Sequence, residues 1–536
     1  QGVSSAASDV YKRQILNLMK AKKYIYSGLL LVGCMLFPSC ESKLDIPQHG
    51  VSNIESYYQT DDEAEEAIVT CYSKWKDVYQ PAFWIKNLLS DDCYSAGESW
   101  TAASAQFLST YTFDADFGQI KTLYTNLYNT IYAANIVLQN VGEDSQVKLR
   151  ARAEAKVFRA MAYIELISLW GTPPLVDHPL ASGEYAQANG DPEALWTLVN
   201  TDLQEAIESG NLVEKAGLND FTFRITKQFA QALLGKAYIF QKKYSEAIIP
   251  LEEVIKSGKY DLYDDLENIL TTKGEANCES LFESNYVYDQ NNATGVMSDM
   301  IWVYVHWRGD MLNFNEPEQV YSHGGWGFFN PTKESYDAFV AEEGTDGYRL
   351  NAYMKTYKQM KDMGISLSEA IAYMPDNAGY FSWKYRVYEA DVINLWWLRC
   401  PNNTRNMRYA EVLLMTAEAY IQTGQPNKAL PYINKVRNRA HLNPLSSVTL
   451  DDLKKEKRLE LWMEGTRYQD LIRWGDAATV LSKRGQERPA LYKDGHVSWD
   501  EQKNPSAGFK SGKHELLPFP TTEMNVNKNM TQNPGW

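Results

Sequence analysis

Cysteine and histidine are scarce in this chain, which has 6 and 7 of them among 536 residues. The cysteines beyond residue 40 are far apart, at Cys71, Cys93, Cys278 and Cys400, and none forms a C-x-x-C pair or a Cys/His spacing. The histidines are equally scattered. Because zinc ligands normally recur at short spacings, we expect neither a metal nor another cofactor.

Motifs of the common catalytic sites are also missing. The sequence contains no G-x-S-x-G, no H-E-x-x-H, no phosphate-binding loop, no G-x-G-x-x-G turn and no EF-hand loop. These motifs hold nucleophiles, metals or phosphates in a fixed position. Without them, the sequence favours a protein that is not an enzyme.

Positive charge is in deficit. Lys and Arg number 53 against 68 Asp and Glu, which gives a formal net charge of −15. Nucleic acids and anionic lipid surfaces attract basic proteins, so we expect neither as a partner. An uncharged or cationic ligand is easier to accommodate.

The apolar run 24–37 is too short to predict a membrane-spanning helix. It follows Met19 and three lysines and ends shortly before Ser39, which is the order of a secretory signal peptide. We expect residues 19–39 to be this signal. Residues 1–18 precede the methionine and are expected to be a non-native leader.

Cys40 directly follows the small residue Ser39, an arrangement typical of lipoprotein processing, in which the acylated cysteine becomes the new N-terminus. Cys34 is the alternative, because it follows L-V-G, but cleavage before it would leave Met35, Leu36 and Phe37 exposed on the tether. We therefore expect lipidation of Cys40. Secretion without a lipid is the other possibility.

Two segments share the spacing of a tetratricopeptide helix hairpin, in which small residues stand where the helices cross. The spacing is met by Ala417, Tyr420, Ala429 and Ile433 in one segment, and by Leu234, Gly235, Tyr238, Ala247 and Leu251 in the other. Such a hairpin buries its apolar face only by stacking on another. The sequence therefore predicts further helix pairs.

Apolar residues at helical spacing predict further helices over 61–79, 117–141, 151–170 and 192–208, and one long helix over about 453–473. Residues 85–105 have the composition of a loop. The long helix would carry a charged stripe formed by Glu460, Glu464, Arg467, Asp470 and Arg473, at steps of three and four residues. We favour an ion-pair ladder, and an acid/base pair of Glu460 and Glu464 is the alternative.

Several segments resemble the SusD/RagB family of surface glycan-binding lipoproteins. Three segments of this chain resemble the family's C-terminal signature: AEVLLMTAEAY, ALPYINKVRNRA and EKRLELWMEGTRYQDLIRWG. The segment EAKVFRAMAYIELISLWGTPPLV resembles the family's N-terminal block, and LLPFPTTEMNVNKNMTQNPGW resembles its ending. These blocks occur in the family's order and bracket nearly the whole mature chain. The resemblance is weak between about residues 261 and 406.

The resemblance implies a mostly α fold, with a tetratricopeptide-like helical-hairpin scaffold and a loop-rich, partly irregular middle insertion. It implies one domain over 40–536, made of a helical part (60–260), the insertion (261–406), the C-terminal signature (407–475) and a tail (476–536). It also implies a protein lipid-anchored in the cell outer membrane, facing the exterior. There it would bind an oligosaccharide and deliver it to a SusC-like TonB-dependent barrel.

A sugar ring has an apolar face and a rim of hydroxyls, so its site needs flat aromatic rings beside polar groups. Composition points to the loop after the first helix, with Asp91, Asp92, Tyr94, Glu98 and Trp100, and to the insertion, with Trp302, Tyr304, Trp307, Arg308 and Trp326. Core packing is the alternative for each tryptophan. Small and polar neighbours indicate exposure most strongly for Trp100 and Trp326.

Two other functions are compatible with the sequence. The protein could be an exported α-helical glycoside hydrolase that uses carboxylates such as Glu460 and Glu464, since this reaction needs two carboxylates on either side of one bond. It could also be a repeat scaffold that binds only protein.

Overall fold

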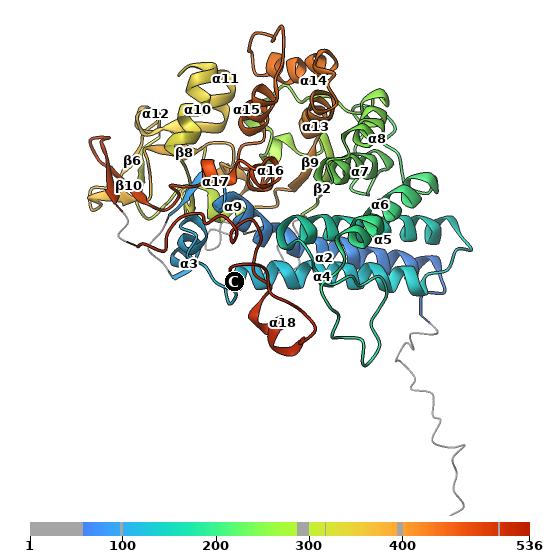
Figure 1. Cartoon of the computed structure of the whole chain (residues 1–536). Helices are drawn as coiled ribbons and strands as arrows, with labels where there is room; N and C mark the ends of the chain where they lie inside the picture. The colour runs from blue at the N-terminus through green and yellow to red at the C-terminus, as the bar shows by residue number, and fades with distance from the viewer. Residues whose placement is uncertain (1–56, 97–99, 287–299, 317, 394–399, 502–503) are drawn as a thin grey trace, which may run out of the picture. The chain divides into compact units, whose positions relative to one another are not determined.

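A row of packed helices forms the first half of the fold (Figure 1). It consists of α2 (Asp61–Leu88), α4 (Gly118–Asn140), α5 (Gln146–Trp170), α6 (Pro192–Glu208), α7 (Lys227–Phe240) and α8 (Tyr244–Lys256). Side chains of Thr60, Ser145, Asp191 and Thr226 cap the first turns of α2, α5, α6 and α7. The four helices predicted in this region are therefore confirmed.

The computed structural model describes residues 57–96, 100–286, 300–316, 318–393, 400–501 and 504–536, without the side chains of 100–104. The predicted leader, signal peptide and Cys40 lie outside these residues. Residues 58–536 form one unit. No helix within the described ranges is both long and apolar enough to cross a membrane.

The two predicted hairpins are present and stack on each other. One is α7 with α8, and the other is α13 (Tyr409–Gln422) with α14 (Pro426–Arg439); α8 packs against α13. A Cβ atom at Gly235 would lie 2.4 Å from Leu251 Cγ, so only glycine allows the two helices to cross this closely. The Tyr420 hydroxyl donates to Glu252 Oε1 (2.9 Å), which links the hairpins across a long stretch of sequence.

Helix α2 continues beyond its predicted end at residue 79, through Pro81 to Leu88. Proline has no N–H for the carbonyl of residue 77, four positions earlier. The Asn126 side chain on α4 donates to that oxygen instead (2.6 Å), so the helix continues without an unpaired carbonyl. The expected loop 85–105 accordingly contains the end of α2, strand β1 (Cys93–Ser95) and helix α3 (Trp100–Ser109).

The prediction of one helix over 453–473 is wrong. Helix α15 (Leu450–Glu460) ends before α16 (Arg467–Trp474) begins, because Met463 and Gly465 have φ angles of 58° and 74°. A right-handed helix cannot continue through such residues. Their amides donate to the α2–β1 segment instead: Met463 N to Asp92 Oδ2 (3.4 Å) and Gly465 N to Asn87 Oδ1 (3.1 Å).

The middle insertion consists of loops, short strands and short helices, as predicted. Antiparallel strand pairs lie within the insertion or join it to other parts of the chain. They are β1 with β4 (Phe329–Pro331), β2 (Ser280–Ser284) with β9 (Thr404–Arg408), β3 (Leu312–Phe314) with β6 (Ile365–Leu367), and β5 (Met354–Thr356) with β8 (Tyr380–Ser382). Strands β7 (Tyr373–Pro375), β10 (Glu487–Tyr492) and β11 (Val497–Glu501) form a sheet in the order β11-β10-β7. The remaining helices are α9 (Ile301–Val305), α10 (Lys333–Glu343), α11 (Tyr348–Tyr353), α12 (Tyr357–Asp362), α17 (Ala477–Val480) and α18 (Thr521–Val526).

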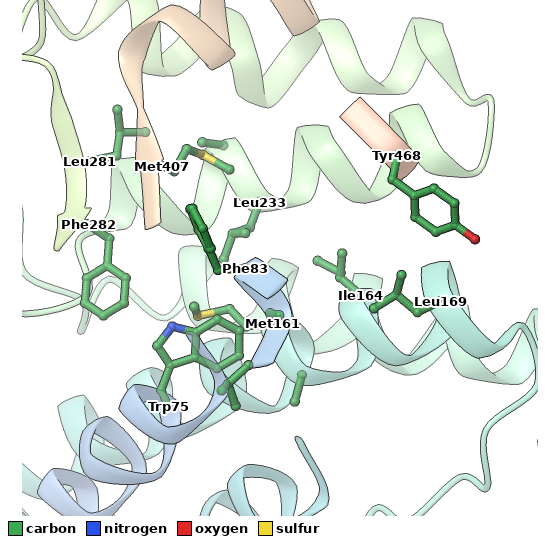
Figure 2. Packing of buried hydrophobic residues seen from close by; sticks show 14 of the residues in the cluster. Trp75, Phe83, Met161, Ile164, Leu169, Leu233, Leu281, Phe282, Met407 and Tyr468 are labelled. Atoms are coloured by element: carbon green, nitrogen blue, oxygen red, sulfur yellow. The ribbon is translucent and has the colours of Figure 1, made fainter. Parts of the chain in front are cut away.

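The main core runs through the helical row and the C-terminal hairpin, and a smaller core lies within the insertion. Figure 2 shows Trp75 and Phe83 of α2 close to Met161 of α5 and Leu233 of α7. The smaller core includes Trp307, stacked on Trp383 with ring centroids 5.2 Å apart. Both cores rest on aromatic and aliphatic burial, the dominant favourable term in folding.

His306 gives the fold a testable pH dependence. The ring is fully buried, donates from Nε2 to Ser322 O (2.7 Å) and accepts at Nδ1 from Val387 N (3.2 Å). Burial lowers its pKa to about 4. The unfolded chain therefore binds a proton more readily, so we expect a loss of about 3 kcal/mol as pH falls from 6.5 to 4.

Urea denaturation of wild type and His306→Gln at pH 7, 5.5 and 4.5 measures this dependence. The gap in unfolding free energy between the two proteins should narrow as pH falls. His496→Gln, at the exposed turn between β10 and β11, is the control and should change the pH dependence less than His306→Gln does. A gap of constant size at all three pH values would contradict the expectation.

Candidate functional site

A cavity of about 160 Å³ lies between β1, α3, the turn after β7 and the start of β10. We call it the aromatic cavity. Two aromatic side chains line it, together with groups that carry hydroxyls, amides or charges: Tyr94 and Phe107, with Ser95, Gln106, Thr112, Asp376, Glu487, Arg488 and Asn504. Such a lining can pack against an apolar face and hydrogen-bond to its rim at the same time.

The segment between α2 and β1 positions Tyr94. Asp91 binds two arginines of the C-terminal signature, accepting from Arg467 Nε (2.8 Å) and pairing with Arg458 Nη2 (2.8 Å). These arginines hold the pKa of Asp91 well below its usual range despite full burial. Asp91 and Asp92 are thus buried anchors of the segment and do not line the cavity.

Tyr94 lines the cavity and contacts a further aromatic side chain, Trp499, which is not one of the lining residues. Its ring lies 6.3 Å from that of Trp499 on β11, at an interplanar angle of 63°, and its hydroxyl donates to Glu334 Oε2 (3.4 Å). Trp499 is 37% exposed and Phe107 is 47% exposed. These rings therefore present accessible faces on which a flat, partly apolar ligand can pack.

Asp376 organises the polar side of the cavity. It accepts from Arg488 through both carboxylate oxygens, with Nε at 2.6 Å from Oδ1, and from Gln106 Nε2 (3.2 Å). Burial raises the pKa of Asp376, and the Arg488 ion pair opposes that shift. The Ser95 hydroxyl also lines the cavity, and it is buried without a hydrogen-bond partner among the described residues.

The predicted site residues are divided between the cavity and the core. Tyr94 lines the cavity, whereas Trp302 and Trp307 are each 2% exposed and donate their indole N–H to Asn402 O (3.1 Å) and Ser382 O (2.8 Å). Arg308 is buried in an ion pair with Asp310. The structure therefore brings Trp302, Trp307 and Arg308 into the core and not to the aromatic cavity.

Trp326, which was expected to be exposed, is half-buried. Its ring packs between Tyr304 (5.4 Å) and Phe328 (5.5 Å), because the backbone of the α9 segment holds it through a bond from Trp326 N to Val303 O (2.8 Å). The side chains of Glu98 and Trp100 lie outside the described residues, so their place in the site stays a prediction.

Phe107, Asp376, Arg488 and Trp499 were not found from the sequence. They come from α3, the turn after β7 and the β10–β11 hairpin, which are far apart along the chain. One local signal was available: the Asp494-Gly495 pair between two β-prone runs predicts a hairpin. Such a hairpin, whose register sets Trp499 opposite Pro489, would have indicated an exposed tryptophan.

Glu460 and Glu464 each form ion pairs with basic side chains, as favoured over an acid/base pair. Glu460 is fully buried and contacts Arg349 (3.2 Å), Arg408 (3.1 Å) and Arg439 (2.5 Å). The three arginines lower its pKa to about 2. Glu464 also binds Arg408 (2.6 Å) and has a lowered pKa. An acid/base pair needs one carboxyl that is protonated near neutral pH, and neither of these meets that need.

A second cavity, of about 80 Å³, lies between α2, α5, α7 and β9. Its walls are mainly core side chains such as Trp75, Phe83 and Met161 (Figure 2). Its charged groups already pair with protein, for example Lys86 with Glu165 (3.0 Å). Within the described residues, no group of three or more His, Cys, Asp or Glu side chains could hold a metal, and the cysteines are free thiols.

The described residues thus form a repeat protein, a scaffold of stacked helix hairpins with a cavity lined by aromatic and polar side chains. Two family models match it, "SusD family" over residues 375–536 and "Starch-binding associating with outer membrane" over residues 52–239. The chain belongs to the SusD/RagB family. The two matched regions contribute the two sides of the aromatic cavity.

Individual relatives and solved structures of the same family are also similar to this chain. A SusD-like protein from Bacteroides ovatus is 26% identical over 84% of this chain and 83% of its own length. The solved structure of a laminarin-binding SusD-like protein is 27% identical, covers 89% of this chain and all of its own, and has a TM-score of 0.75. Surface glycan-binding protein A from Bacteroides thetaiotaomicron, in complex with laminarihexaose, shares the fold at 23% identity, 88% and 99% coverage and a TM-score of 0.71.

Proposed function

We propose that this protein binds an oligosaccharide in the aromatic cavity, at the cell outer membrane, and passes it to a SusC-like TonB-dependent barrel. The observation that carries the proposal is the placement of Tyr94, Phe107 and Trp499 beside hydroxyl, amide and carboxylate groups. Sugar C–H faces pack on such rings, while sugar hydroxyls both donate and accept. A laminarin-binding relative and a family model described as starch-binding support this ligand class.

Binding in this proposal occurs without turnover. Asp376 is engaged by Arg488 and Gln106, and Glu460 and Glu464 are engaged by arginines in the core. None of these carboxylates is placed to transfer a proton to a glycosidic oxygen. The cavity then supplies affinity alone, through ring stacking and hydroxyl hydrogen bonds.

The proposal includes a lipid anchor and a single domain. Cys40 would be acylated, and residues 40–536 would form one domain that stays attached to the outer membrane. A family model described as associating with the outer membrane supports this location. Mass spectrometry of protein purified from membranes tests the anchor, since a lipid mass on a peptide that begins at Cys40 is expected. An unmodified peptide that continues through residue 40 would contradict it.

Isothermal titration against a panel of neutral, uronic-acid and sulfated oligosaccharides tests the binding function. We expect saturable binding of at least one oligosaccharide and no release of reducing sugar on long incubation. Failure to bind any member, together with failure to co-purify with an outer-membrane barrel, would overturn the proposal. Steady release of reducing sugar would instead favour a hydrolase.

A further inference from the structure

Arg488 is the cation among the described residues that line the aromatic cavity. A guanidinium binds carboxylate or sulfate through two parallel N–H donors, which form a fork. In Arg488, the donors Nε and Nη2 are both bonded to Asp376, and the ion pair raises the pKa of Arg488. Asp376 therefore occupies the side-on pair of donors and neutralises the charge that would attract an anionic sugar.

Arg484 does not supply a replacement cation. Its guanidinium stacks 5.2 Å from the Tyr94 ring centroid, and it is 8% exposed. Nη2 donates to Cys93 O (2.6 Å), which holds the group behind β1. This arginine packs against Tyr94 and helps to hold its ring in place, but its charged group lies in the protein interior.

Carboxylates surround the same cavity. Glu487 lines it, and Glu334 accepts from the Tyr94 hydroxyl at its edge. In the β10–β11 register, Asp500 stands opposite Arg488 and Glu501 opposite Glu487. All three of the residues Glu487, Asp500 and Glu501 are exposed. A carboxylated or sulfated sugar would meet like charge here, whereas a neutral sugar can donate its hydroxyls to these oxygens.

We propose that the Asp376–Arg488 ion pair makes the aromatic cavity select uncharged glycans and exclude uronic-acid and sulfated ones, with Asp376 as the specificity-determining residue. The inference rests on the proposed function, because it assumes that the cavity is where glycan binds. Asp376 neutralises the charge of Arg488, and the carboxylates near the cavity repel an anionic sugar. Neutral hydroxyls can still bond to the N–H groups of Arg488 that Asp376 leaves free.

Asp376→Asn tests this assignment with little backbone cost. Residue 376 has a φ of 54°, a conformation that asparagine tolerates well, and its carbonyl would keep the bond from Asn330 Nδ2 (3.1 Å). The substitution removes the charge that holds Arg488. The freed guanidinium fork would then be available to a sugar carboxylate.

The probes are the neutral oligosaccharide that binds most tightly in the panel and the same oligosaccharide oxidised at C6 to carboxylates, titrated at pH 7. Wild type should bind the neutral form at least tenfold more tightly. Asp376→Asn should gain at least tenfold in affinity for the oxidised form, a gain that added salt reverses, so that the preference for the neutral form narrows or disappears. Glu487→Gln, which leaves Arg488 paired, is the matched control and should gain less than threefold.

Glu487→Lys carries the test if Asp376→Asn does not fold, because it adds a cation to the cavity wall at an exposed position. It should also gain affinity for the oxidised probe. Equal binding of both probes by wild type, or an unchanged preference in the folded variants, would overturn the inference and leave the glycan-binding function standing. If no panel member binds to wild type, the proposed function itself fails.

Discussion

Arg408→Met is expected to lower the free energy of unfolding by about 3–5 kcal/mol, because it leaves buried carboxylates without their shared cation. Arg408 is fully buried and contacts Glu279, Glu460 (3.1 Å) and Glu464 (2.6 Å). Burial of an unpaired carboxylate is costly, since the interior replaces little of the lost hydration. Urea denaturation followed by circular dichroism measures the loss.

The matched control is Lys358→Met. Lys358 pairs with Asp362 (2.7 Å) on α12, and both side chains are mostly exposed. Solvent-exposed pairs of this kind contribute little, so the control should cost less than about 1 kcal/mol. If the two substitutions had equal effects, the buried cluster would not be a source of stability. Loss of glycan binding by a stably folded Arg408→Met protein would also be inconsistent with a purely structural role.

The same cluster predicts acid sensitivity. The surrounding arginines lower the folded-state pKa of Glu460 to about 2, from the usual 4.5 of a glutamate, so its stabilising contribution is complete above pH 4.5 and is lost as pH falls toward 2. Wild type should therefore lose stability steeply in this range. In Glu460→Gln the slope should be smaller, because residue 460 can no longer take up a proton on unfolding.

The sequence predicted the helical scaffold well because its signals are local. Small residues such as Gly235 and Ala417 fix where helices cross, and the periodicity of the apolar residues gives the helix bounds. Glu460 and Glu464 do form ion pairs, but with arginines of other elements and not as the expected ladder along one helix face. Their partners could not be predicted, since Arg349, Arg408 and Arg439 come from three other elements. The break before α16 depends on bonds to Asn87 of α2 and to Asp92 in the segment after it, which no local pattern reveals.

The candidate site was only partly predictable for the same reason. Aromatic composition pointed to Tyr94, but it could not separate an exposed ring from a core ring such as Trp302. That distinction depends on tertiary contacts, here the bond of the Trp302 indole to Asn402. Trp499 could not be predicted because it stands in a polar C-terminal hairpin. Its neighbours in sequence are polar, whereas its neighbour in space is Tyr94, which lines the cavity.

Trp499→Ala should weaken glycan binding by tenfold or more while leaving the fold intact. Its ring is partly exposed and lies beside Tyr94, which lines the cavity, so removal takes away a stacking face and little core packing. An aromatic face of this kind contributes through buried area and ring geometry, and tenfold in affinity corresponds to about 1.4 kcal/mol. Isothermal titration with the tightest-binding neutral oligosaccharide measures the loss, and the melting temperature checks the fold.

Tyr132→Ala is the matched control, because Tyr132 is 59% exposed on α4 and does not line the aromatic cavity. It should bind the oligosaccharide as wild type does. Tyr94→Ala should resemble Trp499→Ala, and the double variant should lose less than the sum of the two, since rings 6.3 Å apart would share one sugar. Unchanged affinity in both single variants would place the glycan elsewhere on the protein. A loss in Tyr132→Ala equal to that in Trp499→Ala would show that exposed aromatic rings act without regard to the cavity.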